Sequence, residues 1–311
     1  MPATAMIRPR LSSLLLLAAL SGALSCALSG AATAQDFSKV QVKSEKLNDT
    51  TYMLIGAGGN LAVAFGPDAV FVVDDQYAPM TPKLKAAIAA LTSEPVKFVL
   101  NTHWHGDHTG GNENFGKAGA TIVAHENVRK RMSSDQLIAF FSKPVKASPK
   151  QALPVVTFGR DVTFHLNGDE IHVFHVPNGH TDGDAIVHFK NGNIMHLGDL
   201  FFNKSYPFID ISSGGSVAGV IAAADQALAL ANEDTKIIPG HGPLAGRADL
   251  QAYRDLLRTV AAKLMAHKRD GRTLAEVVAA KPSAEFDALW GKGFITPDAF
   301  VTMLWQDINR K

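Results

Sequence analysis

Cysteine is almost absent from this chain, which has Cys26 alone among its 311 residues. A single cysteine cannot close a disulfide within the chain, and it supplies no set of thiolates for a structural zinc site. Stability must therefore come from packing and from any bound metal. A metal site would need nitrogen and oxygen ligands, and the 12 histidines can supply the nitrogens.

An excess of charge is also absent, because 30 basic residues face 29 acidic ones for a net charge of +1. Without a polybasic face, the chain is not expected to bind nucleic acid or an anionic membrane surface, and a small-molecule substrate is the expected partner. Beyond the N-terminal segment no apolar run is long enough to cross a bilayer, so no membrane span is expected. At 46% hydrophobic residues, the chain can bury a sizeable core.

The N-terminal segment has the pattern of a secretory signal peptide. Arg8 and Arg10 precede a short apolar run over residues 14–20, and Ala-Thr-Ala at residues 32–34 offers a cleavage site between small side chains. We therefore predict that residues 1–34 are a signal peptide and that the mature protein is periplasmic or secreted.

The position of the only cysteine allows a second interpretation of this segment. Cys26 lies within the signal, where Ala23-Leu24-Ser25-Cys26 loosely resembles a lipobox. Ala23 stands where a leucine is usual, so we favour cleavage before Gln35 over lipidation at Cys26.

The remaining chain alternates short strands and helices. Strands are expected between about residues 40 and 75, Thr81-Pro82 opens a helix, and residues 96–101 form a buried strand. Asn167-Gly168 and Asn191-Gly192 lie between apolar runs and predict two hairpins. This order predicts an α+β (or α/β) fold in which helices cover sheets.

The C-terminal part is predicted to be helical from about Asp249. Thr273 with Glu276 has the pattern of a capping box, and Thr296-Pro297 begins the last helix. We therefore divide the mature chain into a catalytic domain, residues 35–248, and a helical extension, residues 249–311. The extension is expected to pack on the domain or on a second subunit, as in a homodimer, through apolar residues that include Leu256, Leu257, Leu264, Phe294, Phe300, Met303 and Leu304.

One loop concentrates metal-binding side chains. Residues 101–108 read Asn-Thr-His-Trp-His-Gly-Asp-His and follow the expected buried strand. In an extended segment residues two apart point the same way, so His103 and His105 can converge on one ion. The glycine permits a sharp turn, after which Asp107 and His108 can face a second ion. These ligands suit zinc, and also iron or manganese.

The order of later motifs resembles a known family. His-x-His-x-Asp-His after a strand is the defining motif of the metallo-β-lactamase superfamily. The family's further elements follow in order as Gly179-His180-Thr181, Leu197-Gly198-Asp199 and Pro239-Gly240-His241-Gly242. The resemblance spans roughly residues 40 to 245 and implies a four-layer αββα sandwich with the metals at one edge.

The resemblance also implies a set of ligands for two metals, most simply two Zn²⁺ ions. His103, His105 and His180 would bind the first metal, Asp107, His108 and His241 the second, and Asp199 would bridge them. Two dications lower the pKa of a shared water, and the resulting hydroxide can open a carbonyl bond. Asp107 could orient this hydroxide or relay a proton, so Asp107 and Asp199 are the candidate catalytic residues. Asp74 or Asp75 is a candidate support for the loop.

Several departures narrow the family resemblance. Asp199 excludes the lactamases that carry cysteine there, and it resembles glyoxalase II, lactonases and related hydrolases. Phe202 stands where those lactamases commonly have a lysine for the substrate carboxylate, although Lys204 lies close by. Glyoxalase II acts on a cytosolic glutathione thioester, which does not fit an exported chain.

Three classes of function stay open at this point. The first is an exported binuclear hydrolase of a β-lactam, lactone or other ester or amide. The second is an oxidoreductase resembling the persulfide dioxygenases, with one iron. The third comprises a non-catalytic metal-binding protein and hydrolases of organic phosphates or sulfates. Trp104 is expected to line the pocket or pack on the sheet. The remaining histidines are expected to be packed or at the surface: His125, His165, His172, His175, His188, His196 and His267.

Overall fold

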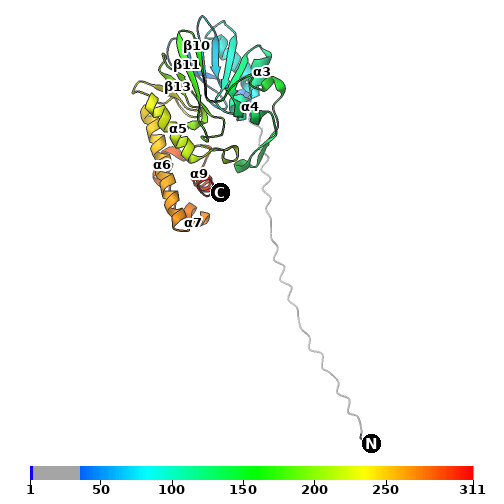
Figure 1. Cartoon of the computed structure of the whole chain (residues 1–311), viewed down its shortest axis with the longest axis vertical. Coiled ribbons are helices and arrows are strands. Elements are labelled where there is room, and N and C mark those ends of the chain that lie inside the picture. Colours follow the sequence, from blue (N-terminus) through cyan, green and yellow to red (C-terminus); the bar gives the residue numbers. More distant parts are fainter. Residues whose placement is uncertain (3–35, 311) are drawn as a thin grey trace. The chain divides into compact units, whose positions relative to one another are not determined.

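The computed structural model describes residues 1–2 and 36–310. The signal peptide, its cleavage before Gln35 and the alternative lipidation of Cys26 therefore concern residues outside the described part, and they stay predictions. From Asp36 onward the chain forms one compact unit (Figure 1). Among the described residues, no helix is both long and apolar enough to span a membrane.

The first sheet has seven strands, in the order β1-β2-β3-β4-β5-β6-β9. They are β1 (Lys43–Lys46), β2 (Thr51–Ile55), β3 (Leu61–Phe65), β4 (Val70–Val73), β5 (Val96–Asn101), β6 (Thr121–His125) and β9 (Val156–Phe158). The strands from β1 to β4 pair antiparallel, whereas β4, β5, β6 and β9 run parallel. Parallel strands end at the same edge of a sheet, so the loop after β5 starts at a shared edge.

The second sheet has five strands, β10 (Asp161–Leu166), β11 (Asp169–His175), β12 (Ala185–Phe189), β13 (Ile194–His196) and β14 (Lys236–Ile238). Both predicted hairpins are confirmed, since β10 pairs with β11 and β12 with β13. In the first turn Asn167 and Gly168 both have positive φ, at 57° and 74°. Asn and Gly tolerate that backbone best, which explains why the sequence pattern located this hairpin.

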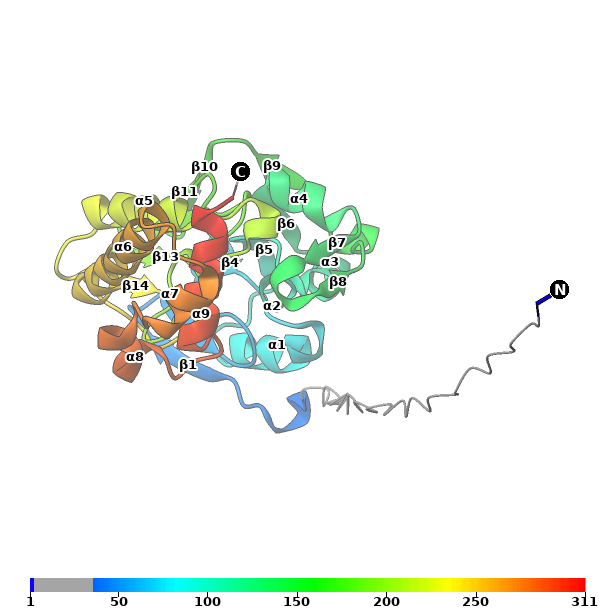
Figure 2. The same ribbon diagram turned by 90° about the horizontal axis from the view of Figure 1, so that it is seen from below.

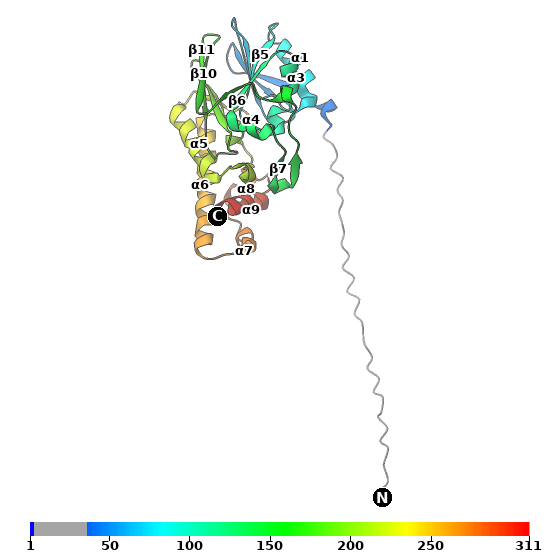
Figure 3. The ribbon, with the colours of Figure 1, turned by 45° about the vertical axis from the view of Figure 1, so that its right-hand side comes forward.

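Three apolar layers hold four layers of secondary structure together. One cluster lies between the sheets and includes Phe71, Leu100 and Val187. A second packs the first sheet against α1 (Thr81–Ala89) and α3 (Asn112–Lys117), and a third packs the second sheet against α5 (Val217–Leu230) and α6 (Arg247–Arg269). The two helical layers lie on opposite sides of the sheets (Figure 3). The expected αββα sandwich is therefore confirmed.

Helix α1 begins at Thr81-Pro82, as predicted, but Thr81 is not its N-cap. A 3-10 turn over Ala78–Met80 leads straight into the helix, so Met80 takes the N-cap position and Thr81 lies in the first turn. The hydroxyl of Thr81 instead accepts a hydrogen bond from Asn114 Nδ2 at 3.0 Å. An N-cap residue has an extended backbone, but Thr81 directly follows a 3-10 turn and itself has helical φ and ψ angles, so it cannot be the cap.

The segment between the two sheets contains a helix that the sequence indicated, after residues 121–124, and a small hairpin that it did not. Helix α4 (Glu126–Met132) follows β6, and strands β7 (Gln136–Ile138) and β8 (Lys143–Val145) form a small separate hairpin. Most residues of this hairpin are exposed, and Pro144 lies in β8. Alternation of apolar and polar residues, the usual signal for a strand, is therefore weak here.

The C-terminal helices share the core of the sandwich. After α6 come α7 (Leu274–Ala279), α8 (Ala284–Trp290) and α9 (Pro297–Ile308), and the predicted caps at Thr273 and Thr296 are confirmed (Figure 2). The ring of Phe300 in α9 stacks on Tyr206 at 4.2 Å. Since α6 begins at Arg247, the helix already includes the predicted boundary at Asp249.

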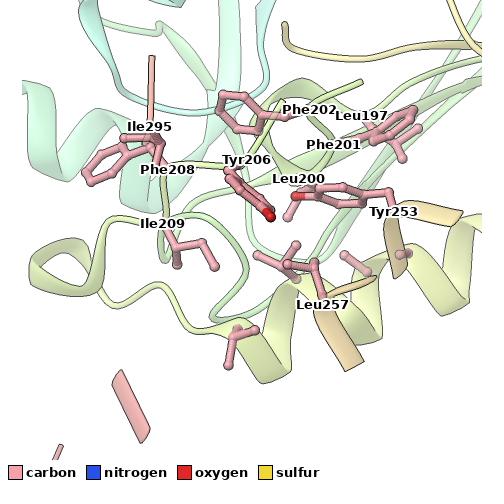
Figure 4. Close-up of a cluster of buried hydrophobic side chains, with 14 of the residues drawn as sticks. Leu197, Leu200, Phe201, Phe202, Tyr206, Phe208, Ile209, Tyr253, Leu257 and Ile295 are labelled. Atoms are coloured by element: carbon pink, nitrogen blue, oxygen red, sulfur yellow. The ribbon is translucent and has the colours of Figure 1, made fainter. Parts of the chain in front are cut away.

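One residue named for the C-terminal packing does not pack on the sandwich. The other apolar residues named for the extension are buried, but Phe294 is 80% exposed. It lies in the loop between α8 and α9, where the next residue, Ile295, is 2% exposed and belongs to the core cluster. Neighbouring residues in this loop point in different directions, so Ile295 takes the buried position and Phe294 does not (Ile295 is labelled in Figure 4).

Candidate metal centre

The candidate ligands lie in loops that follow strands at one edge of the sandwich. His103 and His105 come after β5, His105 still being extended, and the short helix α2 (Gly106–Thr109) then carries Asp107 and His108. His180 lies between β11 and β12, Asp199 lies in a 3-10 turn after β13, and His241 follows β14. The expected turn at Gly106 is therefore the start of a helix.

The structure brings all of the predicted ligands together in two groups. His103, His105, His180 and Asp199 each offer a ligand atom to one group, and Asp107, His108 and His241 to the other, with the atoms of each group within 4.8 Å of one another. None of the seven histidines that we expected to be packed or at the surface belongs to either group.

Asp199 stands between the two groups with one oxygen on each side. Its Oδ2 lies 3.8 Å from His103 Nε2 and 3.6 Å from His180 Nε2. Its Oδ1 lies 3.0 Å from His108 Nε2 and 3.4 Å from His241 Nε2. A carboxylate in this position can offer one oxygen to each of two cations.

Hydrogen bonds behind the histidines determine which ring nitrogen faces the centre. His105 Nε2 donates to Asp210 Oδ2 at 3.0 Å, and His180 Nδ1 donates to the carbonyl oxygen of Phe208 at 2.8 Å. The opposite nitrogens, His105 Nδ1 and His180 Nε2, then face each other with their lone pairs at 2.8 Å. Two lone pairs at this distance repel unless a cation or a proton lies between them.

Asp74 supports the same loop from below. It accepts hydrogen bonds from Thr102 N at 2.7 Å, from Thr102 Oγ1 at 2.8 Å and from His108 Nδ1 at 2.7 Å. Because Thr102 Oγ1 donates to Asp74, it accepts from His103 Nδ1 at 3.0 Å, and His103 Nε2 is left without a proton. Of the two candidate supports, Asp74 contacts the loop with its side chain, whereas the side chain of Asp75 accepts from Gly111 N and only its backbone N–H reaches the loop, at His108 O.

The donor set fits metal ions. His103 Nε2 is fully buried and has no hydrogen-bond partner among the described residues, and the buried Asp199 Oδ1 faces the ring nitrogens of His108 and His241. Burial, with the charge of His108 next, holds the pKa of His103 well below its usual range, so this ring is a neutral donor. Buried polar atoms in native proteins nearly always have partners, and lone pairs that converge without one mark a site for a cation.

The open side of the centre lies at Asp107 and His241, whose side chains are 22% and 29% exposed. Burial opposes ionisation of Asp107, but the charge of His108 and a hydrogen bond from His241 hold its pKa below the usual range. Burial likewise opposes protonation of His241, but the charge of Asp199 and hydrogen bonds to both carboxylates raise its pKa to about 9. In the absence of metal, Asp107 is therefore ionised and His241 carries a proton at the place where it would bind the second metal.

Two glycines allow the backbone to approach the ligands closely. A Cβ atom at Gly59 would overlap the ring of His108, and one at Gly240 would overlap Asp199 Oδ1. Gly240 N also donates to the carbonyl oxygen of Gly198, beside Asp199, at 2.7 Å. These positions cannot take a larger residue without moving a ligand.

Sequence reasoning missed two residues that hold the centre. Asp210 lies behind His105, and Asn60 Nδ2 donates to the carbonyl oxygens of Pro239 and Gly242 at 2.9 Å on either side of His241. Both act across long separations in sequence, so no local spacing marks them. His196 Nε2 donates to the carbonyl oxygen of Asn60 at 3.0 Å, as expected for a packed histidine.

Aromatic rings border the centre. Phe202 stacks on His241 with ring centroids 5.1 Å apart, and Phe208 lies 5.9 Å from His105 and 5.6 Å from His180. Both phenylalanines belong to the large core cluster (Figure 4). Trp104 is buried in the same cluster, as one of its two predicted roles requires. Lys204, the alternative anchor for a substrate carboxylate, is exposed.

Curated relatives match only part of the chain. It is 29% identical over 166 residues to a hydroxyacylglutathione hydrolase of Polaromonas sp., covering 52% of this chain and 55% of that protein. It is 27% identical over 109 residues to a hydroxyacylglutathione hydrolase of Pelagibacter ubique, covering 35% of this chain and 37% of that protein. The chain thus spans between about a third and about half of the length of these relatives.

Solved structures and a family model match more of the chain. A metallo-beta-lactamase from Pontibacter korlensis superposes with a TM-score of 0.57 at 20% identity, covering 70% of this chain and 99% of that one. The DIM-1 metallo-beta-lactamase gives 0.56 at 19%, covering 71% and 99%. At this identity the likeness concerns the fold. The model of the metallo-beta-lactamase superfamily matches residues 48–241, which is more than half of the chain. The chain therefore belongs to the metallo-beta-lactamase superfamily.

Proposed function

We propose that this chain is an exported hydrolase that binds two metal ions and opens a carbonyl bond in a β-lactam, lactone or other ester or amide. The first ion would be held by His103, His105 and His180, and the second by Asp107, His108 and His241. Zinc is the expected metal, because imidazole and carboxylate ligands around compact buried groups suit it, and iron and manganese accept the same donors.

The position of Asp199 carries this proposal. Its two oxygens face different ligand groups, and a carboxylate shared in this way keeps two cations close together. When bound, two dications supply a lowered pKa for the attacking water and a Lewis acid for the carbonyl oxygen. Asp210 and Asp74 hold the histidine rings in the tautomers that present free lone pairs.

Asp107 is the residue suited to moving a proton. It is partly exposed at the open side of the centre, and its lowered pKa keeps it ionised at neutral pH. An ionised carboxylate there can hold the attacking water in position and carry a proton toward the leaving group. His241 lies 3.3 Å from Asp107 Oδ2 and limits the positions this carboxylate can take.

Two observations support a hydrolase over the other open classes. The curated relatives are hydroxyacylglutathione hydrolases, although each matches only part of its length. The second ligand group is also fully assembled, with Asp107, His108 and His241 within reach of one another. An oxidoreductase that uses a single iron at the first site would not require it.

Replacement of Asp199 with Asn tests the proposal. The variant loses the negative charge between the two groups, so we expect it to retain one metal and to lose or weaken the second. Turnover of β-lactam, lactone and thioester substrates should fall by at least about 10²-fold, because the lowered pKa of water and the second Lewis acid are lost together. Metal content by mass spectrometry, measured beside the rate, gives the result.

The surface variant Asp225→Asn is the matched control, since Asp225 only pairs with Arg254 and Arg258 on α6. It should keep two metals and the wild-type rate. Two metals and near-normal turnover in Asp199→Asn would contradict the bridging role. One iron in the wild-type protein would favour the oxidoreductase.

A further inference from the structure

A row of aromatic side chains leads from the metal-ligand histidines to the surface. Phe208 packs beside His105 and His180, the ring of Phe141 lies 4.8 Å from Phe208, and the ring of Phe294 lies 5.3 Å from Phe141. Exposure rises along the row, from 7% for Phe208 to 38% for Phe141 and 80% for Phe294. We call these three residues the aromatic strip.

The strip is assembled from three segments that are distant in sequence. Phe208 lies in the loop after Asp199, Phe141 lies in a 3-10 turn between β7 and β8, and Phe294 lies between α8 and α9. The three rings contact one another although they come from separate segments, so the tertiary fold brings them together beside the ligands. The loop between α8 and α9 contributes the outermost ring, Phe294.

Each segment of the strip is fixed in place. The residue after Phe294, Ile295, is buried in the core cluster, so the backbone at Phe294 is anchored while its ring faces solvent. On the other side, Ser212 Oγ accepts from Ala139 N at 3.1 Å and donates its proton to Asp210 Oδ1. These bonds tie the β7–β8 hairpin to the turn that begins at Asp210, the residue behind His105.

Aromatic side chains, rather than basic ones, contact the candidate ligands. Among the described residues, no lysine or arginine forms a hydrogen bond or an ion pair with any of the candidate ligands. Phe202 stands where the cysteine-bearing lactamases commonly have a lysine for the substrate carboxylate, and its ring stacks on His241. Arg131 is already held by Asp182, with its Nε 2.7 Å from Asp182 Oδ1.

We propose that the aromatic strip binds an apolar acyl chain of the substrate while the reacting carbonyl lies at the metal centre. Phe141 and Phe294 are the exposed members of the strip, and the buried ring of Phe208 connects them to the ligand histidines. Exposed apolar side chains that continue from a polar site mark ligand binding, and ligand pockets combine apolar walls with few polar groups. The inference rests on the proposed hydrolase function, because that function places the reacting bond beside His105 and His180. Recognition is thus by apolar contact along the strip.

Chain length provides the direct test. The full mature protein loaded with zinc is assayed with 4-nitrophenyl butyrate and 4-nitrophenyl octanoate. We expect wild-type kcat/KM to favour the octanoate. Phe294→Ala and Phe141→Ala should each reduce that preference by about tenfold, equivalent to about 1.4 kcal/mol, chiefly through a lower kcat/KM for the octanoate. Phe294→Leu keeps an apolar side chain and should retain most of the preference.

Leu289→Ala is the matched control, because Leu289 lies in α8, is 57% exposed and has no part in the strip. It should leave the ratio of the two substrates unchanged. An unchanged ratio in both strip variants, or a wild-type protein that favours butyrate, would overturn the inference while leaving the hydrolase function in place.

Binding separates this inference from the proposed function. If the wild-type protein hydrolyses neither ester, the esterase part of the proposed function fails, and calorimetric binding of octanamide against acetamide judges the strip alone. Tighter binding of octanamide that Phe294→Ala removes supports the strip, and equal binding overturns it. A second copy of the chain is the alternative occupant of the strip, and sedimentation of wild type and Phe294→Ala tests it. A wild-type dimer that the variant converts to monomers would assign the strip to a subunit interface and overturn the inference.

Discussion

At the scale of single residues, the centre depends on acceptors that stand behind the ligands. Each histidine of the first group donates its rear N–H to a fixed partner, which for His105 is Asp210 and for His180 is a carbonyl oxygen. Asp210 is itself held by hydrogen bonds from Ser213 N at 3.1 Å and Ser213 Oγ at 2.6 Å. Burial opposes its ionisation, but the hydrogen bonds from His105, Ser212 and Ser213 hold the pKa of Asp210 below its usual range.

Asp210→Asn should weaken the first metal site without unfolding the protein. The amide keeps an acceptor oxygen but loses the charge that fixes the His105 tautomer, so zinc affinity at that site should fall by about 10- to 100-fold. Competition with a chromophoric zinc chelator measures the change. Asp225→Asn again serves as the control, and equal zinc affinity for both variants would show that Asp210 only caps its turn.

At the scale of elements, short-range signals predicted more than long-range ones. The Asn-Gly turn at residues 167–168 and the caps at Thr273 and Thr296 depend on a few adjacent residues, and the structure confirms them. The histidine loop could be interpreted for the same reason. Asp210 and Asn60 act on ligands about a hundred or more residues away, and such tertiary contacts leave no pattern in a single sequence.

The burial of the C-terminal helices was predicted, but their role at the site was not. Phe300 stacks on Tyr206, whose hydroxyl donates to Asp287 Oδ1 at 2.7 Å, and Asp307 Oδ2 accepts from Val217 N at the start of α5. These contacts hold the segment that carries Phe208 and Asp210. Apolar periodicity shows that a helix is buried, but it does not show which loop the helix supports.

Deletion of residues 249–311 should therefore give insoluble protein. The truncation cuts α6 in its first turn and exposes the apolar face of α5 and the rings around Tyr206. Soluble yield and circular dichroism measure the outcome. A chain that ends at Ile308 is the control and should fold normally, since α9 is then intact. A soluble and fully active truncated chain would show that the extension is dispensable.

At the scale of the whole molecule, the predicted export would determine which substrates the centre meets. We expect N-terminal sequencing of the secreted protein to begin at Gln35, because the positively charged start, apolar run and Ala-x-Ala site precede it. A mature chain that begins at an acylated Cys26 would contradict a soluble product. An intact Met1 in the cytoplasmic fraction would contradict export itself.

Metal binding should also set the stability of the whole fold. The ligands come from loops after strands of both sheets, so ions that bind the native state alone stabilise the sandwich as a unit. Removal of zinc with a chelator should lower the Tm by on the order of 10 °C, if zinc is in large excess over its Kd beforehand. Differential scanning calorimetry measures the change, and added zinc, unlike added magnesium, should restore the original Tm.

The size of that shift should depend on pH, because protons compete for the second ligand group. Without metal, the charge of Asp199 and the hydrogen bonds to both carboxylates outweigh burial and raise the pKa of His241 to about 9. A pKa raised above the unfolded value of 6.5 gives the metal-free protein stability that is full below pH 6.5 and is lost as the pH rises through about 9. The Tm gained on adding zinc should therefore grow between pH 6.5 and pH 9, where zinc no longer displaces a stabilising proton. His241→Ala removes that proton site and should flatten the dependence, and a gain that shrinks with rising pH in the wild-type protein would show that zinc does not replace protons at this group.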